Sequence, residues 1–206
     1  MRKLGARARN VSGFFVFRFK RILFKPHLQL RMHVANLENI TFPELSPDYR
    51  IRSYLKEDAA SWVSIITSSF GRNYPADEAL DEILNSKEFD ANGLFFITYH
   101  EQPVGTICAR VQSIKEQKTG YLHMLGVIPA HQGKKLGRKL TLCALHYLRR
   151  KGFQDVVLDT DDYRLPAIRT YIDIGFEPVY IERSHKKRWA DVFAKIGFQP
   201  KPSTSR

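Results

Sequence analysis

The alternation of apolar and polar residues predicts a regular order of strands and helices from residue 49 onward. The segment Tyr49-Arg-Ile-Arg-Ser-Tyr54 alternates as a half-buried strand does, and apolar residues then recur at helical spacing over 56–70. The same criteria predict further helices over 73–90, 136–152 and 165–174, and strands over 94–99, 104–113, 120–127, 153–158 and 176–181.

This order indicates the fold class. Strands 94–99 and 104–113 are joined by a hairpin-length connection, whereas the later strands are separated by helices. Hairpins give antiparallel neighbours and helical crossovers give parallel ones. We therefore expect an α/β fold with a central mixed β-sheet flanked by helices.

Length and composition bound the organisation. The chain has 206 residues, 43% hydrophobic, which suits one packed domain. We expect a basic N-terminal extension over 1–48, a main folded domain over 49–200 and a loose tail over 201–206. The two cysteines, Cys108 and Cys143, stand far apart in apolar sequence, which excludes a disulfide scaffold and a paired-cysteine zinc module. A reducing, cytoplasmic location is expected, and no metal site.

The positive charge is concentrated at the N-terminus. Of the 33 basic and 21 acidic residues, nine basic and no acidic ones lie within 1–37, so the rest of the chain is close to neutral. A nearly neutral domain argues against nucleic acid as the partner. Cations interrupt the apolar stretch 14–24, which excludes a membrane-spanning helix there. The basic N-terminal arm is interpreted as an appended strand or flexible extension. The alternative is a weak contact between residues 1–37 and a membrane surface.

The segment 122–140 carries the main chemical signal. A strand ends at Val127, and a loop with Gly133 and Gly137 opens a helix whose first residues are cationic. A helix N-terminus is already positive, so Lys134, Lys135 and Arg138 are unfavourable there without an anion. Backbone N–H groups at that end bind phosphates. The pattern therefore predicts a pyrophosphate site.

Two motifs resemble a known superfamily. Val127-x-Pro129-x-x-Gln132-Gly-Lys-x-x-Gly137 resembles the pyrophosphate loop of the GNAT superfamily of acetyl-CoA-dependent N-acetyltransferases, and residues 164–176 resemble its Asn-x-x-Ala-x-x-x-Tyr-x-x-x-Gly-Phe helix. The resemblance covers about 49–182 and implies the acyl-CoA N-acyltransferase fold. Lys135 stands where the family has the first loop glycine, and Arg164 where it has asparagine.

The resemblance also implies residue roles. The backbone of 125–127 would hold the pantetheine arm of acetyl-CoA, and the loop amides its pyrophosphate. Tyr171 would donate a proton to the departing thiolate. The expected cofactor-binding residues are Leu125, Gly126, Val127, Gln132, Gly133, Lys134, Lys135, Leu136, Gly137, Arg138 and Arg164.

The proton acceptor is expected to be His123, because the strand 122–127 resembles that of serotonin N-acetyltransferase. An unperturbed imidazole with a pKa of about 6.5 accepts protons near neutrality; packing as a core residue is the alternative. Tyr121 would be its neighbour on the same strand face. The carboxylates Asp159, Asp161 and Asp162 are interpreted as caps of the following helix rather than metal ligands.

These features predict an N-acetyltransferase. We expect an acetyl group to pass from acetyl-CoA to a primary amine, in a small molecule or peptide, by direct attack in a ternary complex. Buried cysteines give no thiol nucleophile for an acyl-enzyme. The resemblance places the acidic stretch 77–90 at the substrate entrance, which implies a weak preference for a cationic amine. The alternative is a non-catalytic acyl-CoA sensor carried to a membrane or partner by the basic arm.

Overall fold

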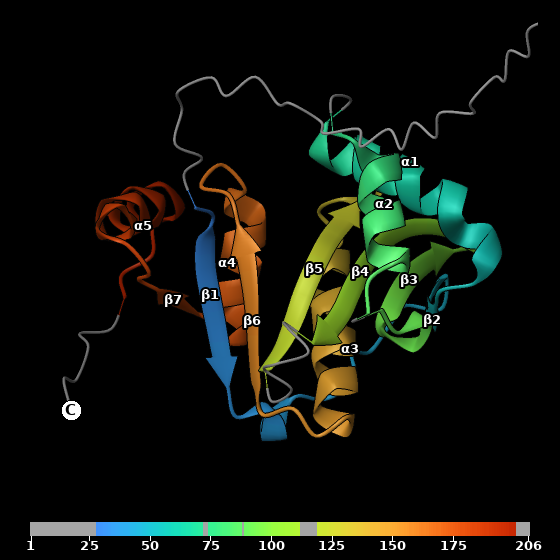
Figure 1. The fold of residues 1–206 in the computed structure, drawn as a ribbon, viewed down its shortest axis with the longest axis horizontal. Helices are drawn as coiled ribbons and strands as arrows, with labels where there is room; N and C mark the ends of the chain where they lie inside the picture. The colour runs from blue at the N-terminus through green and yellow to red at the C-terminus, as the bar shows by residue number, and fades with distance from the viewer. Residues whose placement is uncertain (1–27, 72–73, 88, 112–118, 201–206) are drawn as a thin grey trace, which may run out of the picture.

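The computed structural model describes residues 28–71, 74–87, 89–111 and 119–200, which build one seven-stranded sheet (Figure 1). The strand order is β2-β3-β4-β5-β6-β1-β7. Among the paired strands of this described region, only β5 and β6 run parallel. The bounds are β1 Leu30–Ala35, β2 Tyr49–Ser53, β3 Leu94–Tyr99, β4 Gln102–Val111, β5 Thr119–Val127, β6 Asp155–Thr160 and β7 Glu177–Val179. The mixed sheet predicted from the sequence is confirmed.

Helices cover both faces of this sheet. Figure 1 shows α1 and α2 on one face, α3 and α4 on the other, and α5 beyond β7. Each face has its own buried core. Helix α1 contributes Trp62 and Ile66 to one core, and α3 contributes Leu140 and Leu145 to the other. The helices are α1 Ala59–Phe70, α2 Ala76–Leu84, α3 Leu136–Arg150, α4 Leu165–Ile174 and α5 Arg183–Ile196, with short 3-10 turns at Leu37–Asn39, Lys56–Asp58, Ala91–Gly93 and Pro129–His131. Among the described residues, no helix is both long and apolar enough to cross a membrane.

The structure corrects the start of the folded region. Residues 30–35, placed in the N-terminal extension by the sequence analysis, form β1, which pairs antiparallel with both β6 and β7. Leu30 and Met32 are fully buried. A strand in the interior of a sheet cannot be an appendage, so the sheet begins at residue 30 rather than at 49. The expected tail 201–206 and most of the basic arm lie outside the described residues.

Two features of β5 open the sheet for a ligand. β5 and β6 pair only from Thr119 to Leu122, and beyond that point the strands separate (Figure 1). A bulge also interrupts β5: Cys108 of β4 faces His123 but Thr106 faces Gly126, and Met124 has a φ of 55°. A bulge inserts one extra residue and re-aims the side chains that follow it. Leu125, Gly126 and Val127, three of the residues expected to hold a cofactor, therefore lie where β5 leaves its parallel neighbour.

Candidate active site

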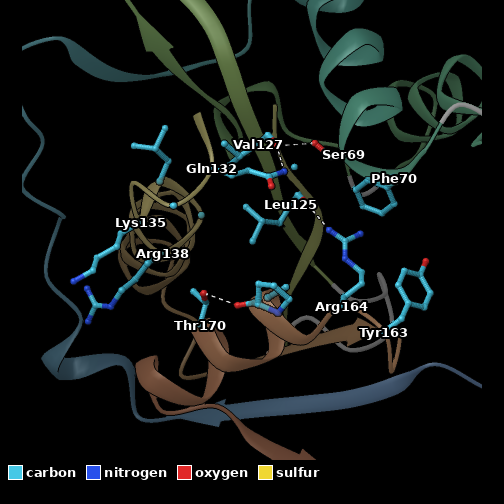
Figure 2. A pocket seen from close by; sticks show the side chains of 16 residues that line it. Ser69, Phe70, Leu125, Val127, Gln132, Lys135, Arg138, Tyr163, Arg164 and Thr170 are labelled. Atoms are coloured by element: carbon cyan, nitrogen blue, oxygen red, sulfur yellow. Dashed lines mark hydrogen bonds between the residues drawn. The ribbon is translucent and has the colours of Figure 1, made fainter. Parts of the chain in front are cut away.

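The loop between β5 and α3 exposes the start of a long helix. Gly133 has a φ of 76° and Lys135 a φ of 59°, and α3 begins at the next residue. The left-handed conformation costs a residue other than glycine about 1–2 kcal/mol. Lys135 therefore takes a left-handed backbone conformation that favours glycine. Its side chain is exposed, and Figure 2 shows it on the outer side of the loop beside Arg138.

Cations surround this helix start without acidic partners. The first turn of α3 contains no acid and no capping side chain. Among the described residues, no carboxylate lies within ion-pair distance of Lys134, Lys135 or Arg138. Unpaired cations beside free N–H groups make a site of strongly positive potential. This arrangement is suited to an anion such as a pyrophosphate.

A cavity of about 490 Å³ adjoins this helix start. Ten of the eleven expected cofactor-binding residues line it. The exception is Lys134, whose Nζ lies 5.9 Å from the centre of the Tyr99 ring. The lining comprises Ser69, Phe70, Leu125, Gly126, Val127, Gln132, Gly133, Lys135, Leu136, Gly137, Arg138, Tyr163, Arg164, Pro166, Ala167 and Thr170 (Figure 2). The loop motif, β5 and the start of α4 therefore come together around one space.

Hydrogen bonds fix the end of β5 against its neighbours. The Val127 carbonyl accepts bonds from Gln132 Nε2 at 3.0 Å and from Ser69 Oγ at 3.1 Å (Figure 2). On the β2 side, the Tyr49 hydroxyl lies 2.8 Å from Nδ1 of His131, in the 3-10 turn just before the loop. These contacts hold the loop from two directions.

Gly126 allows α1 to approach this strand closely. A Cβ atom there would lie 2.9 Å from Ser69 Oγ and 3.1 Å from Ile66 Cδ1. Gly126→Ala is therefore expected to lower the free energy of unfolding by about 1–3 kcal/mol, as overpacking does. Urea unfolding followed by circular dichroism measures this. A variant as stable as the parent would show that α1 moves away from β5 without cost.

Both expected catalytic residues, Tyr171 and His123, line a second, smaller cavity of about 140 Å³. It lies where β5 and β6 separate, and it shares four lining residues with the first cavity: Phe70, Leu125, Tyr163 and Arg164. The two spaces therefore meet at these residues, which places the candidate proton-transfer groups next to the candidate cofactor cavity.

Tyr171 is buried on α4, and burial raises its pKa to about 12, with the Arg164 charge opposing the shift. The phenol is therefore protonated throughout the neutral range, as a proton donor must be.

His123 differs from the expectation of an unperturbed imidazole. Burial, assisted by the charge of Arg110, lowers its pKa to about 4. The ring is neutral at pH 7 and can accept a proton, but it is a weaker base than the expected pKa of about 6.5 implies. Tyr121 is its neighbour as predicted, with ring centres 5.6 Å apart.

Asp159 within β6 and Asp162 just after it are ion-pair partners rather than helix caps, and Asp161 accepts a hydrogen bond from Gln29 Nε2 at 3.1 Å. Arg31 of β1 binds both oxygens of Asp159 at 2.8 and 2.9 Å, and the Tyr121 hydroxyl donates to Asp159 at 3.1 Å. Arg188 of α5 pairs with Asp162. The residue before α4 is Arg164, which makes no side-chain cap bond. The predicted capping role is therefore wrong: these carboxylates tie β1 and α5 to the site.

Several site residues were not predicted. Ser69, Phe70 and Tyr74 come from the end of α1 and the loop after it, and Tyr163 and Thr170 from the α4 region. The Tyr74 ring is tilted against that of Phe70, with ring centres 5.0 Å apart, and its hydroxyl donates to the sulfur of Met124 at 3.6 Å. No local motif marks the residues at the end of α1, because only the packing of α1 against β5 brings them to the site; Tyr163 and Thr170 lie beside and within the 164–176 motif.

A parallel pair of strands that separates beside a cationic helix start is suited to an anionic ligand. A family model described as the acetyltransferase (GNAT) family matches residues 59–176, more than half of the chain. The chain belongs to this family, as the two motifs indicated.

The names of curated relatives agree with this assignment. The mycothiol acetyltransferase of Nocardia farcinica is 36% identical over 97 residues, 46% of this chain and 32% of that protein. The enzyme of the same name from Renibacterium salmoninarum is 26% identical over 83% of this chain and 52% of its own length. The chain thus spans about half or less of the length of these relatives.

Structural likeness extends over most of the chain. A GCN5-related N-acetyltransferase from Sphaerobacter thermophilus has a TM-score of 0.58 at 18% identity, covering 74% of this chain and 49% of that one. A GNAT family acetyltransferase from Brucella melitensis in complex with acetyl-CoA has a TM-score of 0.51 at 22% identity, covering 65% and 88%. At these identities the likeness establishes the fold.

Proposed function

We propose that this protein is an N-acetyltransferase that moves an acetyl group from acetyl-CoA to a primary amine by direct attack in a ternary complex. One observation carries the proposal: unpaired cations and free helix N–H groups adjoin a cavity that meets a second cavity containing Tyr171 and His123. An anionic carrier and an acyl-transfer centre are both accommodated by this arrangement.

The residues present suit acetyl-CoA. A Cβ atom added at Gly133 would meet no heavy atom within 4 Å, so the loop backbone is open to a ligand. The loop 132–138 would hold the pyrophosphate, the backbone of 125–127 the pantetheine arm, and Arg164 the region near the thioester. The co-substrate supplies an activated acyl group on a good leaving group.

The chain's own side chains would handle the protons. Tyr171, protonated at neutral pH, donates to the sulfur as the thioester opens. Neutral His123 accepts the proton released by the attacking nitrogen. Burial raises the pKa of both the Cys108 and Cys143 thiols to about 12, which supports direct attack over an acyl-cysteine intermediate.

The acceptor is proposed to be a small-molecule or peptide amine. The names of the curated relatives, which are mycothiol acetyltransferases, favour a small molecule. The exposed acids Asp77, Asp81 and Glu82 on α2 favour a cationic one. A cytoplasmic site of action remains part of the proposal, supported by two free cysteines.

The test is a thiol-release assay with acetyl-CoA over a panel of primary amines, run beside calorimetry with coenzyme A. Amine-dependent thiol release with saturable binding is expected. Binding without release for any amine would instead favour the non-catalytic acyl-CoA sensor. An absence of binding would contradict both functions.

Gly137 offers a sharper test of the pyrophosphate site. It is helical, and a Cβ there would meet only Leu125 Cδ2, at 3.8 Å, so neither conformation nor packing demands glycine. Gly137→Ala is expected to leave stability unchanged or raise it by up to about 1 kcal/mol. The added methyl group, beside the N–H groups, should weaken coenzyme A binding about tenfold through loss of one charge-assisted hydrogen bond. Calorimetry measures the affinity and urea unfolding the stability. An unchanged affinity for coenzyme A would show that the pyrophosphate does not bind at the start of α3.

A further inference from the structure

Arg164 occupies the junction of the two cavities and lines both. Its Nη2 donates to the Leu125 carbonyl at 3.0 Å, one residue past the bulge in β5. Its guanidinium carbon lies 3.9 Å from the centre of the Phe70 ring. Figure 2 shows the guanidinium between Leu125 and Phe70. The head group is thus held from both sides at the place where the cavities meet.

This cation has no carboxylate partner. Among the described residues, no acidic oxygen lies within 4.0 Å of its nitrogens, whereas Arg31, Arg52 and Arg188 are each paired with an aspartate. Arg164 is also only partly exposed. A guanidinium that is partly desolvated and unpaired favours the arrival of negative charge.

The charge of Arg164 acts on the candidate proton donor. Arg164 immediately precedes α4 and Tyr171 lies on that helix, and both side chains line the smaller cavity. Arg164 opposes the upward shift of the Tyr171 pKa, so its field reaches the phenol. The neutral His123 adds no competing charge there.

We propose that Arg164 is a catalytic residue that stabilises the negative charge developing on the departing sulfur. The proposal rests on the proposed function. The amine nitrogen forms a bond to the carbonyl carbon, the carbon–sulfur bond breaks, and its electron pair goes to the sulfur facing Arg164. The nitrogen loses its proton to His123, and the sulfur gains the Tyr171 proton. Tyr171 and His123 return to their starting states by exchange with solvent.

The replacement of the family's asparagine then has a chemical consequence. An asparagine amide offers a dipole, whereas a guanidinium offers a full charge and five donors in a plane. A phenol whose pKa is raised by burial is a poor acid alone, and a nearby cation reduces the need for early proton transfer. Arg164 and Tyr171 would share the stabilisation of the sulfur.

The test is an ultraviolet titration of the thiol of bound coenzyme A, with the desulfo-coenzyme A complex subtracted to remove tyrosine ionisation. In the parent protein the thiol pKa should lie about one unit or more below that of free coenzyme A. Arg164→Asn should abolish this depression, and Arg164→Lys should retain part of it. Saturating ligand keeps the comparison independent of affinity.

Arg169→Asn is the matched control, because Arg169 is exposed on the same helix and paired with Asp173. It should leave the thiol pKa unchanged. An undepressed thiol pKa in the parent protein, or equal depression in the Arg164→Asn variant, would overturn the role of Arg164 while leaving acetyl transfer intact. Failure of coenzyme A to bind the parent protein would instead overturn the proposed function, and this inference with it.

Discussion

Replacement of Tyr171 by phenylalanine is expected to reduce kcat about 100-fold, the lower end of the range for loss of a general acid. Tyr171 is buried beside the cavity junction, and its ring packs 5.7 Å from that of Phe176. Phenylalanine keeps this packing and removes only the proton donor. The expected reduction in kcat is at the lower end of that range because the Arg164 charge still stabilises the departing sulfur. Steady-state kinetics with the best amine of the panel measures it.

The division between kcat and KM separates chemistry from binding. Loss of a proton donor that acts on the transition state lowers kcat and kcat/KM together, and leaves the KM for acetyl-CoA nearly unchanged. Tyr180→Phe is the control, because Tyr180 is half exposed and lies outside both cavities. A Tyr171→Phe enzyme with undiminished kcat would show that Tyr171 is only a core residue.

Elements with local start and stop signals were predictable from the sequence. The helix expected over 165–174 is α4 with the same bounds, because Gly175 takes a φ of 113° and the Phe176 N–H returns to the Tyr171 carbonyl. Gly197 and Phe198 end α5 in the same way. Such caps depend on a few consecutive residues, so they are readable without knowledge of the fold.

β1 was missed although its residues carry the alternation typical of a strand. Leu30, Met32 and Val34 alternate with polar residues, but the segment follows a long basic stretch and precedes the regular pattern. Its place in the sheet comes from pairing with β6 and β7, which lie at least 120 residues further along the chain. Long-range pairing of this kind leaves little trace in local composition.

The site shows the same division. The pyrophosphate loop and the α4 motif are contiguous in sequence, and their residues meet in one cavity. The depressed basicity of His123 was missed because it depends on burial and on Arg110 of the adjacent strand. Ser69 and Phe70 reach the site only because α1 packs across β5.

The anchoring of α1 leads to a second prediction, on stability. Arg52 of β2 binds both oxygens of Asp58 at 2.6 and 2.7 Å, and the Leu55 N–H donates to the same carboxylate. Asp58 is 3% exposed and stands just before α1, whose far end carries Ser69 and Phe70. Arg52→Ala leaves a buried carboxylate without its cation. The free energy of unfolding at pH 7 should fall by about 3–5 kcal/mol.

The pH dependence identifies the cause. Burial acts to raise the Asp58 pKa, but the Arg52 and Leu55 hydrogen bonds outweigh it and lower the pKa. A lowered pKa contributes stability that is present above the unfolded value of about 3.9 and is lost as pH falls through the folded value. The loss of stability caused by Arg52→Ala should therefore shrink in acid, where Asp58 becomes neutral in either protein.

Arg50→Ala is the control, because Arg50 is 76% exposed and lies 3.6 Å from an equally exposed Glu101. It should change the free energy of unfolding by no more than about 0.5 kcal/mol. Urea unfolding between pH 3 and pH 8 measures all three proteins, and a deficit of constant size across that range would mean that Arg52 acts through packing rather than through the Asp58 charge.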